Sequence, residues 1–285
     1  MALTELNNIS IAEIVLYTPA LALAIFLAVR HGFGRNAGWL YLIIFSLARI
    51  IGSALQLATV ADPRNISLYV GAATLQNVGL SPLILVQLAL LSRALESAGR
   101  SPSAPGGGNG NGIALGTRLL RLVQLVLLVG LILGAVGGSS AGSNYAATGS
   151  YSQSTTLSRA GTALMIAGYV LLVAATGVVA ATQLSRVEAG ERRVVLAVGL
   201  SLPFILVRLV YSAESVYSGN PAFNLITGDR NILLGMAVIM EMIVVAVVEG
   251  VGITLKVRPR SAEGPTKVQQ RLRERDGYEM NESRV

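Results

Sequence analysis

Three ionisable residues lie near the middle of long apolar stretches of the chain: Arg49, Arg208 and Glu241. A lone charge in the hydrocarbon of a bilayer costs several kcal/mol, so such groups are usually paired and often mark a ligand or ion path. Counted at 1.5 Å per helical residue, all three fall within about 5 Å of the midplane of their segments. The sequence therefore predicts that opposite charges from three helices meet inside a membrane.

Polar side chains recur at helical spacing beside these charges. Ser53 follows Arg49 by one helical turn, and Ser212 follows Arg208 in the same way. Two guanidiniums and one carboxylate leave an excess positive charge, which either a polar neighbour spreads or a bound anion completes. Because arginine binds carboxylate and phosphate through a planar fork, an anionic amphiphile is a suitable ligand. A closed network that only serves packing is the equally weighted alternative. Glu13 is placed near the outer boundary of its segment. The predicted site consists of Arg49, Arg208, Glu241, Gln76, Asn77, Ser53, Ser212 and Tyr211.

Seven apolar segments must position these residues. Hydrophobic residues make up 53% of the 285-residue chain and charged residues only 13%, which is not the composition of a soluble domain. Crossing a hydrocarbon core takes roughly 20 helical residues. The sequence therefore predicts an all-α, polytopic membrane protein with a seven-transmembrane-helix bundle. The predicted helices are residues 11–29, 38–60, 67–91, 117–137, 159–183, 194–217 and 231–255.

The distribution of basic residues predicts the orientation of the bundle. Most of the 22 Lys and Arg residues fall in the first, third and fifth loops and in the C-terminal tail. By the positive-inside rule, the N-terminus is outside and the C-terminus is cytosolic. Residues 1–10 are then a short outer N-terminus, 11–255 the transmembrane domain, and 256–285 a basic, disordered cytosolic tail. The glycosylation sequons at Asn8 and Asn65 fall on the predicted outer side. The predicted location of the protein is either the plasma membrane or an endomembrane.

Absent residue types exclude several functions of seven-helix proteins. Lysine occurs only at Lys256 and Lys267, so no amine in the middle of the membrane can form a retinal Schiff base. His31 is the single histidine and there is no cysteine, which excludes a multi-histidine zinc site and a catalytic thiol. No nucleophile, base and orienting group form a recognisable set. We therefore expect no enzyme activity, cofactor or metal, and membrane lipids rather than nucleic acid as partners.

Three stretches carry a resemblance to a known family: FSLARIIGS at residues 45–53, LQNVGLSP at 75–82 and RLVYSAE at 208–214. They resemble an uncharacterised family of fungal seven-helix integral membrane proteins, and the resemblance covers almost the whole membrane region. A more distant similarity is to the fungal RTA-like lipid-translocating exporters, and it is carried by Arg208 and Glu214 in the sixth segment and by the acidic Glu241 of the last helix. This similarity implies movement or sensing of amphipathic lipids or toxicants.

Three classes of function remain, and each predicts a different structure. A protein that binds, senses or translocates an amphipathic lipid or toxicant, which we place first, predicts an opening between helices toward one leaflet. A receptor-like signalling protein predicts an outer pocket under the Gly- and Ser-rich loop expected at residues 137–158. A structural membrane scaffold predicts a tightly packed centre without a cavity.

Overall fold

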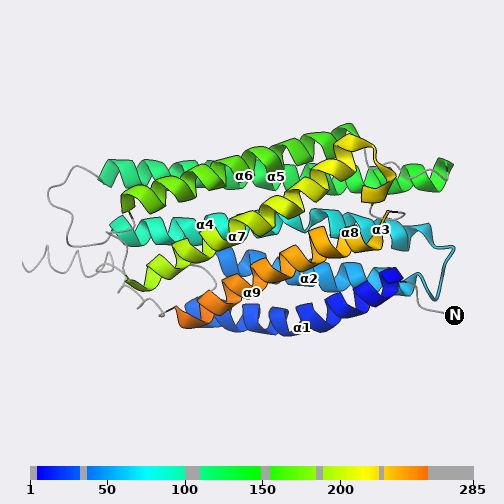
Figure 1. Ribbon diagram of the computed structural model, residues 1–285, viewed down its shortest axis with the longest axis horizontal. Coiled ribbons are helices and arrows are strands. Elements are labelled where there is room, and N and C mark those ends of the chain that lie inside the picture. The colour runs from blue at the N-terminus through cyan, green and yellow to red at the C-terminus, as the bar shows by residue number, and fades with distance from the viewer. Residues whose placement is uncertain are drawn as a thin grey trace, which may run out of the picture. The chain divides into compact units, whose positions relative to one another are not determined.

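The computed structural model describes residues 5–32, 37–99, 110–148, 155–183, 189–224 and 228–255, and the regular secondary structure in these ranges is all helical. Figure 1 shows the long helices running side by side. The elements in chain order are α1 (Glu5–His31), α2 (Ala37–Ala58), α3 (Ile66–Val78), α4 (Leu80–Gly99), α5 (Gly110–Thr148), α6 (Thr156–Gln183), α7 (Ala189–Ala213), η1 (Glu214–Ser218), η2 (Pro221–Phe223), α8 (Arg230–Leu233), η3 (Leu234–Val238) and α9 (Ile239–Thr254).

Seven helical spans in this part of the chain are long and apolar enough to cross a membrane, in the order that the sequence predicts. The first begins at Glu5 rather than at residue 11, which places every residue of α1 deeper in its span than the sequence count does. These spans indicate a multi-pass membrane protein. The sidedness of the termini stays a prediction, and the predicted tail, 256–285, lies outside the described residues.

The span Ile66–Glu96, built from α3 and α4, is the central one. Of its most apolar window 89% is buried, against 17% for Arg118–Ser140 of α5. In Figure 1, α4 lies between the pair formed by α5 and α6 and the helices α2 and α9. The outer helices expose large apolar side chains such as Leu125 and Val178. Such exposure is expected of side chains that face lipid rather than water.

The helical hydrogen-bonding pattern of the central span is interrupted at Gly79, between α3 and α4, while the backbone of Gly79 stays in the right-handed helical region. Pro82 stands three residues later and has no backbone N–H, so it cannot donate the helical hydrogen bond to the carbonyl of Val78. The break lies level with the buried charges described below. A glycine at this point also leaves open space next to the backbone.

The last span contains a π-helical turn, η3, immediately before α9. A π turn holds one more residue than an α turn, and such bulges occur often at functional sites. Glu241 follows η3 by three residues. The widened turn therefore sets the direction in which this carboxylate points.

The prediction of a loop at residues 137–158 is wrong for most of this stretch, which is helical. Helix α5 continues to Thr148, and α6 begins at Thr156. The small residues that suggest a loop instead let the two helices approach closely: a Cβ on Gly137 would lie 2.6 Å from the backbone nitrogen of Ser158, and one on Gly161 would lie 2.8 Å from that of Gly134. Glycine at helix contacts is favoured inside membranes for this reason.

Candidate functional site

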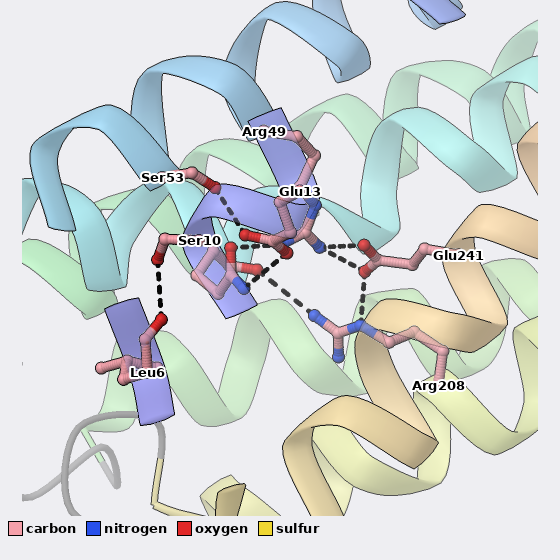
Figure 2. Close-up of polar contacts among 8 residues, drawn as sticks. Leu6, Ser10, Glu13, Arg49, Ser53, Arg208 and Glu241 are labelled. Carbon is pink, nitrogen blue, oxygen red and sulfur yellow. Dashed lines mark hydrogen bonds and ion pairs between the residues drawn. The ribbon is translucent and has the colours of Figure 1, made fainter. Parts of the chain in front are cut away.

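Four buried charged residues from four different helices form one ionic network (Figure 2). Glu13 comes from α1, Arg49 from α2, Arg208 from α7 and Glu241 from α9. None of the four side chains is more than 2% exposed. We refer to these residues as the quartet.

Glu241 joins the two arginines, as the sequence predicts. Arg208 donates a hydrogen bond from Nε to Oε1 of Glu241 over 2.6 Å, and Arg49 donates to the same carboxylate from Nη2. Two charge-assisted bonds to one fully buried carboxylate are among the strongest polar contacts in proteins. Removing one partner of such a buried pair typically costs about 3–5 kcal/mol.

Glu13 is the residue that the sequence reasoning missed. Its carboxylate accepts hydrogen bonds from Ser53 Oγ at 2.5 Å and from Gln76 Nε2 at 3.1 Å. Nη1 of Arg49 lies 3.9 Å from its Oε1, so Figure 2 shows the Arg49 guanidinium between Glu13 and Glu241. The placement of Glu13 near the outer boundary was wrong because α1 begins earlier than expected. Ser10, Glu13 and Tyr17 share one buried helix face, and that spacing was the available signal.

The quartet is balanced in formal charge, with two guanidiniums and two carboxylates. The excess positive charge expected from three residues is offset by Glu13. Charge balance therefore does not call for an anion, and the anionic ligand stays a prediction without support from this geometry.

Neighbouring polar groups accept further hydrogen bonds from the arginines. Gln76 accepts from Nη1 of Arg49 through its side chain, and its backbone oxygen accepts from Nη2 of Arg208 at 3.3 Å. Ser212 accepts from Nη1 of Arg208, one turn away on the same helix. The ring centroid of Tyr211 lies 5.5 Å from Cζ of Arg208, a distance at which a cation–π contact contributes. Gln76, Ser212 and Tyr211 thus lie where the sequence places them.

Asn77 lies apart from the quartet. A Cβ on Gly138 of α5 would stand 3.7 Å from its Nδ2. On a helix, adjacent residues point about 100° apart, so Gln76 and Asn77 cannot both face the same site. The structure selects Gln76, and Asn77 faces α5.

Gly79 gives the Arg49 guanidinium its space. A Cβ on this glycine would lie 2.8 Å from Cζ and 3.0 Å from Nε of Arg49. Those distances are shorter than van der Waals contact, so no larger residue fits without displacing the arginine. The interruption of the central span at Gly79 therefore lies directly beside the Arg49 guanidinium and makes room for it.

A pocket with a cavity volume of about 30 Å³ adjoins the carboxylate of Glu13. It lies at the end of the bundle where α1, α3 and α8 begin and α2 ends. The lining includes one member of the quartet, Glu13, and neither arginine. We refer to it as the Glu13 pocket. Its lining residues are Leu6, Ser10, Glu13, Gly52, Ser53, Gln56, Tyr69, Ala72, Ala73, Gln76 and Leu233.

The comparisons with known proteins give a family without an assigned activity. Residues 3–258 match the sequence model of the domain of unknown function DUF7702. The chain belongs to this family. The DUF7702 match spans all seven helical spans and the whole quartet, in agreement with the expected uncharacterised family. The chain matches no curated protein and no solved structure. The similarity to the RTA-like exporters stays a prediction.

Proposed function

We propose that this membrane protein binds the polar end of an amphipathic lipid or toxicant in the Glu13 pocket, as the first step of sensing or translocating it. The observation that carries the proposal is a pocket lined by polar side chains directly beside a buried ionic network. A scaffold would be expected to pack this centre without a cavity. A receptor-like protein predicts a pocket under residues 137–158, and none of the described residues of this stretch lines the Glu13 pocket.

The volume of the pocket limits what enters it. About 30 Å³ holds one or two water molecules or a polar group of that size, and not an acyl chain. A ligand with a longer apolar part would leave that part outside, where the helix surfaces are apolar. The proposal therefore concerns an amphiphile that inserts only its polar end.

A pair of matched leucine substitutions tests this proposal. Ala73→Leu fills the Glu13 pocket, whereas Ala54→Leu makes the same chemical change on the exposed face of α2. Native mass spectrometry of the full chain, with extraction of the lipids that copurify, reports which molecule stays bound. We expect Ala73→Leu to lose a bound amphiphile that wild type and Ala54→Leu retain.

Equal retention of the same molecule by both variants would remove the pocket from the proposal. A thermal melt of each variant accompanies the comparison, because a loss of ligand counts only when the variant unfolds at nearly the wild-type temperature.

A further inference from the structure

We propose that the Glu13 pocket takes an uncharged hydroxyl head group in preference to an ammonium or a carboxylate. This inference rests on the proposed function, since it names the chemical class of the polar end that the pocket binds. It follows from three properties of the pocket: the charge of the quartet, the hydrogen-bonding groups in the lining and the volume.

The charge of the quartet is already zero before a ligand arrives. A bound ammonium or carboxylate would add a charge that has no counter-charge in a site of low dielectric constant, where such a charge is costly. A carboxylate would also approach Glu13 directly, because neither arginine lines the pocket. An ammonium would stand close to Arg49, whose Nη1 is 3.9 Å from Oε1 of Glu13. A neutral head group avoids both penalties.

The lining offers hydrogen-bond acceptors and donors together. The two oxygens of a carboxylate have about four acceptor positions. Those of Glu13 face three partners, Ser53, Gln76 and the more distant Arg49, so about one position is left. The Ser10 hydroxyl donates to the backbone oxygen of Leu6 at 3.0 Å, which leaves its lone pairs as acceptors. Both groups can accept a hydrogen bond from a ligand.

Gln56 and Tyr69, also in the lining, carry groups that can donate. A hydroxyl is the smallest head group that both donates and accepts. An ammonium has only donors, and a carboxylate has only acceptors. The volume of about 30 Å³ fits a hydroxyl and the carbon that bears it. Straight-chain alcohols and sterols both carry such a hydroxyl at their polar end.

The chain contains no cysteine, so one introduced cysteine reports on the pocket without background. Leu6→Cys places a thiol in the pocket lining without removing a hydrogen-bonding group, and Ala61→Cys places one on an exposed turn at the same end of the bundle. The full chain in lipid nanodiscs is labelled with methyl methanethiosulfonate. Decanol, cholesterol, decylamine, decanoate and decane are the competitors.

We expect decanol or cholesterol to halve the labelling rate of Leu6→Cys at a concentration about tenfold lower than decane requires, because one good hydrogen bond improves affinity by about that factor. Labelling of Ala61→Cys should not change, and which of the two alcohols acts shows whether the source is a straight chain or a sterol. Equal or stronger protection by decylamine or decanoate would overturn the hydroxyl assignment and leave the proposed function in place. Protection by none of the four polar amphiphiles would overturn both.

Discussion

Replacing Gly79 by alanine tests the close approach between the central span and the Arg49 guanidinium. The added Cβ would lie 2.8 Å from Cζ and 3.0 Å from Nε of Arg49, so one of the two must move. Overpacking of this kind costs about 1–3 kcal/mol. A displaced guanidinium also weakens its bond to Glu241, and a hydrogen bond to a charged group contributes about 1.5–3 kcal/mol. We expect Gly79→Ala to lower the free energy of unfolding by about 3 kcal/mol.

Thermal unfolding in detergent measures this loss through the fluorescence of Trp39, the single tryptophan, which is buried. For a chain of this size, about 3 kcal/mol corresponds to a fall in Tm of about 6–12 °C. Gly199→Ala is the matched control, because a Cβ there meets no atom within 4 Å. This control should keep or slightly raise the Tm, since alanine favours helix over glycine.

A double-mutant cycle locates the effect in the contact itself. With Arg49→Ala as the background, the alanine at position 79 has nothing to displace. There it should change the free energy of unfolding by less than about 0.5 kcal/mol. A Gly79→Ala protein that melts with the wild type, or one that loses as much stability without the Arg49 guanidinium as with it, would refute the reasoning.

Further predictions concern the quartet, the helix contacts and the sidedness of the bundle. Glu13→Gln leaves two guanidiniums with one carboxylate and should lower the free energy of unfolding by about 3–5 kcal/mol. The control Glu5→Gln, at the exposed start of the same helix, should lower it by less than about 0.5 kcal/mol. Similar losses in both variants would show that Glu13 is not an essential partner. Arg208→Gln should lower stability by a similar 3–5 kcal/mol, because Glu241 loses one of its two cations; a melt that matches wild type would mean that Arg49 alone satisfies this carboxylate. Gly161→Val should separate α5 from α6 and cost at least about 1–3 kcal/mol, measured in the same melt. In intact cells that carry the chain at their surface, Ala61→Cys should react with a thiol reagent that cannot cross membranes, and labelling of this surface population only after permeabilisation would reverse the predicted orientation.

The number and order of the spans could be predicted because membrane thickness imposes a length on each helix. The convergence of Arg49, Arg208 and Glu241 could be predicted for a related reason, since buried charges need partners and these three lie at similar depth. Neither inference needed a tertiary contact. Both follow from the cost of exposing polar groups to hydrocarbon.

The rest depended on details that composition does not carry. Glu13 was missed because the depth of a residue was counted from the first apolar residue, while α1 begins at Glu5 with polar residues in its first turns. Asn77 and Gln76 are adjacent and chemically alike, so only the direction of α3 distinguishes them. Gly130 and Gly137 of α5 lie against α6, and a single sequence cannot tell a glycine at a helix contact from one in a loop.

The π turn η3 fixes the rotation of the residues of α9 about the helix axis. Successive residues of an α-helix differ by about 100° in direction, so removing one residue from Leu234–Val238 would rotate all that follows by that angle relative to the preceding turn. Glu241 would then point away from both arginines, although its depth would change by only about 1.5 Å. The composition and hydropathy of the span would hardly change. This turn therefore fixes the direction of Glu241 around the helix axis. A homologue with one residue fewer in the turn would need its acidic residue at a different position to stay paired with the arginines.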